Sequence, residues 1–550
     1  MKPRKTWSAF TILALSAALA GCSAVTTDVE AFDPDTPSVS TESKDIVPEH
    51  AEGPLAQADR PLAERTISET DTTVTVDIDF GNTTTDKQFT AALRGQLVVP
   101  KPGTEAAKKF AETGSPLIVI SHLRSPNCLD GTFAFPCKTG VQEIRSDRGM
   151  NYYAQFLAEQ GYTVIVPDLG GIFVGVDVKF PYDQHAMWKE SVEKFVTGLK
   201  SDGAGKTQIF GVDKLGKIDF SKVGLLLHSR SGSVVEPAQE VFGKASVKTV
   251  LAYGPSYDTF ELSEISAAPA DIPYLAIVGE DDADVGASAN LWLGHYLPQK
   301  RQHPAAVVSV PGLGHMFINQ AAVDAGADDR IGCEERSCPD AAEHQRVLKE
   351  VGLDWFNATL TGADTKLPLT ATTALPDQVA GLPARWLAYT PQPLLSVGAD
   401  QFKGASEKTL QLCINPDPMN PTPVSNACPE PESGLVQILT KVAYLTDASA
   451  EVEVKDAKGI ALHLAPAGTM SGEGAELKVV LTLADGTSHT LEVPPTHSAL
   501  KNRSTSDFNG VYQLTTIRLE LPAEVSGGVI KKIQLLAPTH PVEFKSVDFF

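Results

Sequence analysis

Residues 222–233 read Lys-Val-Gly-Leu-Leu-Leu-His-Ser-Arg-Ser-Gly-Ser and join an apolar run to a cluster of small residues. The apolar run predicts a buried strand, and the residues after it predict a helix from about Gly232 to Phe242. A serine at such a strand-to-helix bend is held with its hydroxyl exposed at the carboxyl edge of a sheet. The start of the helix also offers backbone N–H groups to a developing negative charge. This stretch therefore predicts an α/β sheet that carries a reactive serine.

On both sides of this stretch, apolar strands alternate with helical segments. Strands are expected at residues 73–80, 93–100, 116–121, 162–168, 223–227, 247–253, 274–278 and 305–310, and helices at 150–160, 185–199 and 341–359. Continuous apolar runs indicate strands that are buried on both faces. Their alternation with helices predicts a doubly wound, mostly parallel sheet.

The pattern changes along the 550 residues and predicts four regions. We expect a signal peptide at 1–21, a disordered tether at 22–72, an α/β domain at 73–370 and an all-β sandwich at 375–550. The tether is rich in Ser, Thr, Pro and acidic residues and has no periodicity. After residue 375 short alternating strands replace the helical pattern, and Asp485-Gly486 is a hairpin signal.

The segment His228-Ser229-Arg230 resembles the nucleophile elbow of the α/β-hydrolase family, a G-x-S-x-G turn. Leu227 and Ser231 stand where that pattern usually has its two glycines. The resemblance implies Ser229 as the nucleophile. A second register stays open, in which Ser231 is the nucleophile and lies between two other small residues, Ser229 and Ser233.

Two later segments resemble the parts of that family that complete a catalytic triad. Residues 272–282 resemble the seventh strand with its acidic turn, which implies Asp282 as the acid, with Asp281 and Asp284 close by in sequence. Residues 308–317 resemble the eighth strand and its histidine loop, which implies His315 as the general base. The order Ser, Asp, His is that of the family.

The resemblance also implies an oxyanion hole made of two backbone N–H groups. We expect one from Arg230, directly after the nucleophile, and the other from Leu123, in the loop after the strand 116–121. His122 is expected to support that loop. For Arg124 two roles stay open, a contact with an anionic substrate group and a surface salt bridge, and we expect the salt bridge. Residues 169–200 and 316–340 are expected to border the substrate pocket.

These residues together predict a serine hydrolase that cleaves carboxylic esters through an acyl-enzyme, similar to carboxylesterases and lipases. No metal and no organic cofactor is implied. The substrate would be a small-molecule, lipid or polymer ester. Two alternatives stay open: an amidase or peptidase that uses the same triad, and an inactive scaffold of this fold that serves as a surface-binding lipoprotein. The expected sandwich could add a glycan or polymer ligand.

The N-terminus carries Lys2, Arg4 and Lys5, a short apolar run, and then Leu19-Ala20-Gly21-Cys22. This resembles the lipobox of bacterial lipoproteins and implies lipidation of Cys22. The lipid would anchor the protein in a membrane of the cell envelope. Ser23, directly after the cysteine, favours the outer membrane. The formal net charge of −22 argues against a nucleic-acid partner.

Seven cysteines occur, and six remain when Cys22 is set aside. They fall in three close pairs, and an even number in an exported protein indicates disulfides. We expect the pairs Cys128–Cys137, Cys333–Cys338 and Cys413–Cys428.

Overall fold

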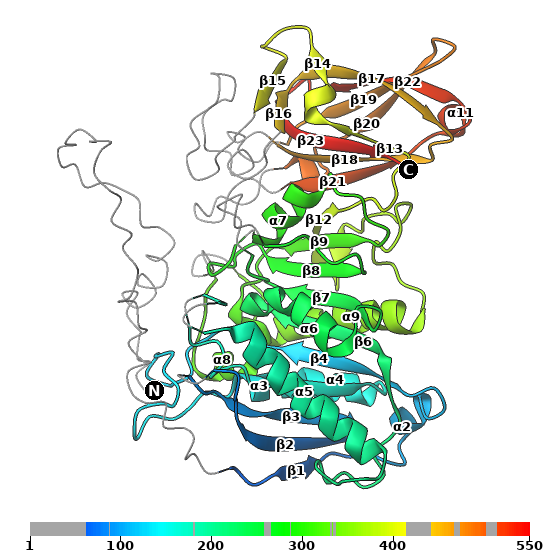
Figure 1. The fold of residues 1–550 in the computed structure, drawn as a ribbon. Coiled ribbons are helices and arrows are strands. Elements are labelled where there is room, and N and C mark those ends of the chain that lie inside the picture. The colour runs from blue at the N-terminus through cyan, green and yellow to red at the C-terminus, as the bar shows by residue number, and fades with distance from the viewer. Residues whose placement is uncertain are drawn as a thin grey trace, which may run out of the picture. The chain divides into compact units, whose positions relative to one another are not determined.

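The computed structural model describes residues 62–86, 89–175, 177–179, 182–257, 266–286, 288–330, 333, 337–413, 442–466, 474–501 and 514–550. Figure 1 shows a large mixed sheet with helices on its faces, and two antiparallel sheets formed by the last third of the chain. The predicted α/β class is confirmed.

The large sheet contains ten strands in the order β1-β2-β3-β5-β4-β6-β7-β8-β9-β12. Neighbours from β5 to β9 are parallel, whereas β1, β2, β3 and β12 join the sheet in antiparallel pairs. The strands are β1 Thr66–Glu69, β2 Thr73–Asn82, β3 Ala92–Pro100, β4 Ser115–Ser121, β5 Thr163–Pro167, β6 Ile218–His228, β7 Val247–Tyr253, β8 Tyr274–Gly279, β9 Ala305–Val310 and β12 Arg385–Ala388. Because the central strands are parallel, their carboxyl ends meet at one edge of the sheet.

Helices cover both faces of this sheet. The main ones are α4 Asn151–Glu159, α5 Gln184–Gly203, α6 Val235–Phe242, α7 Ser288–Tyr296 and α9 Ala341–Phe356. Leu225 and Leu227 of β6 share a core with residues of α5, α6 and α7, whereas Leu226 shares a second core with residues of α4 and α9. Successive side chains of a strand point to opposite faces, so a strand between two cores must be apolar throughout.

The last third of the chain forms two antiparallel sheets. One contains β13 Leu395–Gly398, β15 Leu410–Cys413, β16 Val442–Leu445, β18 Gly459–Pro466, β21 Thr515–Glu520 and β23 Val542–Phe549. The other contains β14 Lys403–Gly404, β17 Asp447–Lys455, β19 Leu477–Leu483, β20 Ser488–Val493 and β22 Val529–Leu536. Apolar residues of both sheets share one core, as the predicted sandwich requires. Asp485-Gly486 connects the paired strands β19 and β20, as the hairpin signal predicts.

Two strands lie outside the predicted domain boundaries. β1 falls within residues 22–72, which were expected to be a tether, and β12 lies beyond residue 370, the expected end of the α/β domain. All four side chains of β1 are exposed, so no apolar alternation marks it. β12 is four residues long and is added to the free edge of β9, a pairing that no local pattern signals.

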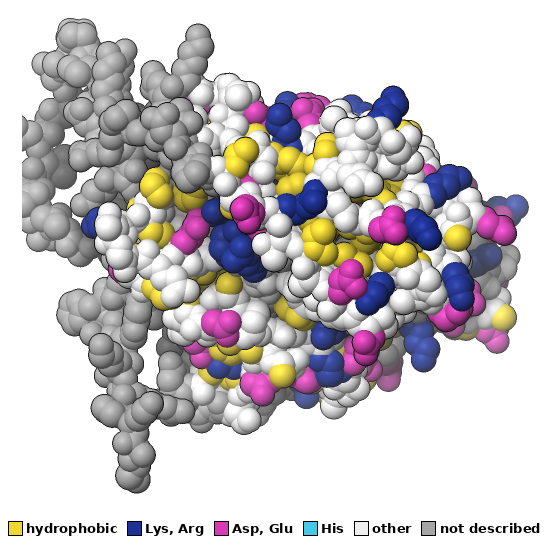
Figure 2. Space-filling view, turned by 90° about the horizontal axis from the view of Figure 1, so that it is seen from below, with side chains coloured by type: hydrophobic (Ala, Val, Ile, Leu, Met, Phe, Trp, Pro, Cys, Tyr) yellow, Lys and Arg dark blue, Asp and Glu magenta, His cyan; other side chains and the backbone are white. Residues whose placement is uncertain are grey.

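The disulfides Cys128–Cys137 and Cys333–Cys338 are confirmed. For the third predicted pair, Cys428 lies outside the described residues, and so does the predicted lipidation site Cys22. In the part of the chain that the structure describes, no helix is long and apolar enough to cross a bilayer. On the face in Figure 2, basic and acidic side chains are interspersed.

Candidate active site

Ser229 lies at the turn between β6 and the helical segment that follows it. A 3₁₀ helix, η2 Ser229–Val234, begins at Ser229 and continues into α6. The φ angle of Ser229 is +59°, in the left-handed region that residues with a side chain rarely adopt. Such strain is typical of a sharp nucleophile elbow. The strained turn therefore lies at Ser229, the residue that the first of the two registers makes the nucleophile.

Ser231, the alternative nucleophile, is fully buried. Its Oγ donates a hydrogen bond to the carbonyl oxygen of His122 at 2.7 Å. This hydroxyl therefore connects η2 to the loop that follows β4, the loop expected to supply the second oxyanion donor.

That loop is held by His122. Its Nε2 accepts the N–H of Leu169 at 2.8 Å, and its Nδ1 therefore carries the proton donated to the carbonyl of Leu123 at 2.8 Å. Leu123 itself is buried, and its N–H donates to no acceptor among the described residues. The N–H group of Leu123 is thus available beside the elbow.

The acidic turn after β8 and the histidine loop after β9 meet at the same edge of the sheet. Nδ1 of His315 lies 2.9 Å from Oδ2 of Asp282, and both side chains are fully buried. The other oxygen of Asp282, Oδ1, accepts the N–H groups of Asp284 at 2.9 Å and of Val285 at 2.8 Å. Fixed in this way, the carboxylate can orient the imidazole and stabilise its charged form.

Two other acidic residues hold the histidine loop. Oδ2 of Asp281 accepts the N–H of Gly312 at 2.6 Å. The carboxylate of Asp329 accepts the N–H groups of His315 at 2.7 Å and of Met316 at 2.9 Å. Asp281 therefore contacts the backbone of the histidine loop, whereas Asp282 contacts the imidazole itself. No sequence signal marked Asp329, because its contact with His315 is made by the folded chain.

Gly254, directly after β7, leaves room for the imidazole. A Cβ at this position would lie 2.7 Å from Nδ1 of His315 and 3.1 Å from Oδ2 of Asp282. Its φ of +46° also favours glycine.

The electrostatic surroundings of His315 are strongly acidic. Burial alone lowers the pKa of His315, but Asp282 and Asp284 outweigh burial and raise it to about 10. Oδ2 of Asp284 lies 3.5 Å from Nε2 of His315. Among the described residues Nε2 has no hydrogen-bond partner. Burial and the charge of Asp282 raise the pKa of Asp329 to about 6, although the charge of His315 and the N–H groups of Met316 and His315 act in the opposite direction.

His228 is a structural neighbour of the site. Its ring lies 4.8 Å from that of His315, and its Nε2 contacts the carbonyl oxygen of His315 at 3.1 Å. Burial and the charge of His315 lower the pKa of His228 far below its ordinary value. A neutral His228 therefore supports the histidine loop without adding charge.

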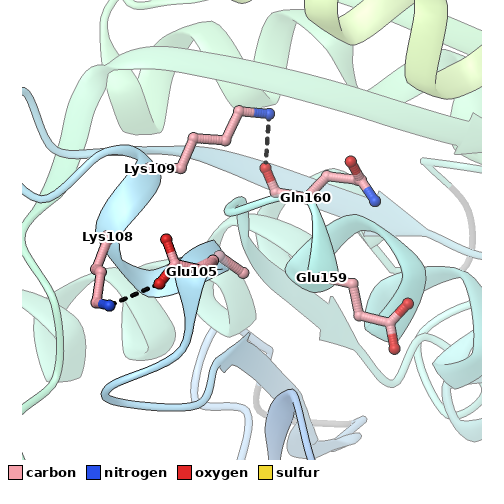
Figure 3. Close-up of a pocket in the computed structure, with 6 residues that line it drawn as sticks. Glu105, Lys108, Lys109, Glu159 and Gln160 are labelled. Carbon is pink, nitrogen blue, oxygen red and sulfur yellow. Dashed lines mark hydrogen bonds and ion pairs between the residues drawn. The ribbon is translucent and has the colours of Figure 1, made fainter.

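Elsewhere, the described residues contain no group of three or more His, Cys, Asp or Glu side chains arranged to hold a metal ion. A surface depression between α2 Glu105–Lys109 and the end of α4 is lined by Glu105, Lys108, Lys109, Glu159 and Gln160, and none of them is a predicted site residue (Figure 3). Nζ of Lys108 donates to Glu105 at 2.6 Å, and Nζ of Lys109 donates to the carbonyl of Gln160 at 3.0 Å.

No protein-family model matches the chain, and no curated protein matches it. Among solved structures, similarity is found to a sugar hydrolase of Lactococcus lactis, at 13% identity over 54% of this chain and 99% of that one, with a TM-score of 0.27. A fluorophosphonate-binding serine hydrolase of Staphylococcus aureus is similar at 11% identity over 51% of this chain and 97% of that one, with a TM-score of 0.27. The family 6 carbohydrate-binding module of a Zobellia galactanivorans laminarinase is similar at 15% identity over 28% of this chain and 97% of the module, with a TM-score of 0.17.

At these scores the similarities identify no reaction and no ligand for this chain. The chain's own strand order, with a strained strand-to-helix turn at the carboxyl edge, is consistent with an α/β-hydrolase-like fold. Counted from β2, the acidic turn follows the seventh strand and the histidine loop the eighth.

Proposed function

We propose that this chain is a serine hydrolase that cleaves carboxylic esters, with Ser229 as nucleophile, His315 as general base and Asp282 as the acid that orients it. One observation carries the proposal: the left-handed Ser229 directly follows β6, at the sheet edge where the His315–Asp282 pair also lies. A serine at a strained turn, on the sheet edge that also carries a carboxylate-bound imidazole, supplies the parts that nucleophilic acyl transfer uses.

In the first half of the reaction, Oγ of Ser229 attacks the ester carbonyl carbon while its proton passes to Nε2 of His315. The carbonyl oxygen becomes an oxyanion, which accepts hydrogen bonds from the N–H groups of Leu123 and Arg230. Collapse of the intermediate expels the alcohol, which takes the proton from His315 and leaves the acyl group on Ser229. Water then gives a proton to His315 and attacks the acyl carbon; the bond from that carbon to Oγ of Ser229 breaks, Oγ takes the proton back from His315, and the carboxylic acid leaves.

The proton-accepting step requires a neutral His315. With its pKa raised to about 10, first by Asp282 and then by Asp284 beside Nε2, the imidazole is protonated at neutral pH. The side chain of Asp284 is 34% exposed, so it can turn toward solvent when substrate enters. We infer that substrate binding separates Asp284 from His315 and so frees Nε2 to act as a base.

Fluorophosphonate labelling, located by peptide mass spectrometry, tests the proposal directly. The label should attach to Ser229, disappear in Ser229→Ala and persist in Ser231→Ala. Labelling of Ser231 would keep the reaction class but move the nucleophile. A folded protein that takes up no label would remove the proposal and favour an inactive binding scaffold.

The leaving group is a separate question from the nucleophile. An amidase or peptidase would use the same residues, so rates on matched ester and amide substrates decide between them. The proposal predicts that the ester of a matched pair is cleaved and the amide is not.

Two further proposals come from the sequence alone. Lipidation of Cys22 would anchor the protein at the bacterial cell envelope, and labelled palmitate should be incorporated by the full chain and lost in Cys22→Ala. A glycan or polymer ligand of the antiparallel sheets is tested by affinity electrophoresis in polysaccharide gels.

A further inference from the structure

Two arginine side chains belong to the segments that carry the proposed oxyanion donors. Arg124 directly follows Leu123, and Arg230 directly follows Ser229. Nε of Arg124 donates to the carbonyl of Phe173 at 3.0 Å, and Nη1 of Arg230 donates to the carbonyl of Gly175 at 2.5 Å. The two acceptor carbonyls, of Phe173 and Gly175, are two residues apart in the chain. One short segment therefore holds both guanidinium groups.

Arg124 keeps its terminal nitrogens available. Its guanidinium carbon lies 4.0 Å from the centre of the Phe133 ring, which fixes the plane of the group. Among the described residues, no acceptor is bonded to Nη1 or Nη2 of Arg124, and no carboxylate lies at ion-pair distance from it. This departs from the surface salt bridge expected from the sequence. A half-buried, rigidly held guanidinium with unused donors is suited to bind an anion bidentately.

The local charge supports the same reading. Burial and, after it, the positive charge of Arg124 lower the pKa of Arg230 to about 10. The only described carboxylate whose charge favours both cations is that of Asp284, which lies beside Nε2 of His315. A pair of neighbouring cations in a protein of net charge −22 is held against mutual repulsion and is stabilised by an incoming anion.

We propose that Arg124 and Arg230 bind the carboxylate of an ester substrate that carries a second, charged carboxyl group, such as a hemiester of a dicarboxylic acid. The inference rests on the proposed function and names its substrate class. The charged end would lie against the arginine side chains while the ester carbonyl lies against the neighbouring N–H groups of Leu123 and Arg230. An anion at this place also competes with Asp284 for the two cations.

The test compares mono-para-nitrophenyl adipate with para-nitrophenyl hexanoate, which has the same chain length and no charge. The native protein should prefer the hemiester in kcat/KM by about 10- to 100-fold, as hydrogen bonds to charged groups provide. Arg124→Gln should abolish that preference, and Arg124→Lys should keep part of it. Arg346→Gln, an equal loss of charge in an ion-paired side chain of α9, is the matched control and should leave the ratio unchanged.

Binding of adipate and of neutral adipamide by calorimetry gives a readout that needs no turnover. Adipate should bind the native protein, adipamide should not, and Arg124→Gln should weaken adipate at least about tenfold. A native protein that cleaves both esters equally, or a preference that survives in Arg124→Gln, overturns the inference and leaves the hydrolase proposal standing. If neither ester is cleaved and Ser229 takes no label, the proposed function fails, and loss or persistence of adipate binding in Arg124→Gln decides the anion site by itself.

Discussion

Nε2 of His315 lies 3.5 Å from Oδ2 of Asp284, on the opposite side of the ring from the Asp282 carboxylate. The imidazole is thus held between two carboxylates, and Asp329 adds a third negative charge through the backbone of the histidine loop. Burial holds the pKa of the neighbouring His228 far below its ordinary value, so this ring adds no charge at neutral pH. A ring placed in this way keeps its proton until one of the carboxylates leaves.

Asp284→Asn should make the enzyme active at lower pH. Removing this charge lowers the pKa of His315, so a larger fraction of the imidazole is neutral at any pH below that pKa. The acidic limb of kcat/KM should move down by about one pH unit. Steady-state rates across pH, with an NMR titration of the His315 ring, measure the shift. Asp324→Asn, at an exposed carboxylate on α8 Gln320–Asp324, is the control, and an acidic limb that stays in place in Asp284→Asn would contradict the role of Asp284.

Gly254→Ala should reduce activity far more than stability. The new Cβ would need to occupy space 2.7 Å from Nδ1 of His315, so the ring must move away from its position beside Asp282. A displacement of this size costs about a hundredfold in kcat. Steady-state kinetics measure the loss, and urea unfolding measures the cost to the fold.

Gly205→Ala separates the clash from backbone strain. Gly205 also has a positive φ, +68°, but a Cβ there would meet no atom within 4 Å. This control should lose about 1 kcal/mol of stability and no activity. Equal losses of activity in the two variants would mean that strain, and not contact with His315, explains the glycine.

Ser231→Ala should slow the reaction while Ser229 remains reactive. The substitution removes the buried hydrogen bond to the carbonyl of His122 and loosens the loop that carries Leu123. We expect kcat/KM to fall about tenfold, with the fluorophosphonate label still on Ser229. Ser115→Ala is the matched control, because the buried Ser115 hydroxyl also donates to a backbone carbonyl, that of Gly161 at 2.7 Å, but lies at the start of β4, at the opposite end from the Leu123 loop. If Ser115→Ala lost as much activity, the hydrogen bond to His122 would not be the cause.

The sequence predicts the central sheet well because its strands are buried on both faces. The strands expected at 247–253 and 305–310 agree with β7 and β9 to the residue, since every residue in them except Lys248 is buried. β1 and β12 escape prediction because they are short edge strands whose existence depends on a partner, β2 or β9, that is already in place.

The candidate site divides in the same way. Ser229, Asp282 and His315 could be named because each follows a recognisable strand in the expected order. Gly254 and Asp329 could not, because their contacts with His315 exist only when separate loops meet at the sheet edge. Sequence spacing does not distinguish a carboxylate at Nδ1 from one at Nε2, so it could not reveal the position of Asp284.

Asp168→Asn should destabilise the protein at the loop beside the oxyanion donor. Oδ2 of Asp168 accepts a hydrogen bond from Nε of Arg94 at 2.7 Å and lies 3.3 Å from Nε of Arg145. The next residue, Leu169, donates its N–H to His122, which positions Leu123. Loss of one member of a buried ion pair costs about 3–5 kcal/mol. Arg94 and Arg145 each keep another acidic partner, so we expect a loss of about 3 kcal/mol in urea unfolding.

The same variant should change how stability depends on pH. Burial raises the pKa of Asp168, but Arg94 and Arg145 outweigh it and hold the pKa well below its ordinary value. A depressed pKa contributes stability that is present above the unfolded value of about 3.9 and is lost as the pH falls below it. The difference in free energy of unfolding between the native protein and Asp168→Asn should therefore be largest at neutral pH and become smaller in acid. Asp213→Asn, at an exposed carboxylate, is the control and should leave the free energy of unfolding unchanged at either pH. If the loss of stability in Asp168→Asn stayed the same in acid, the ion pairs would not be its source.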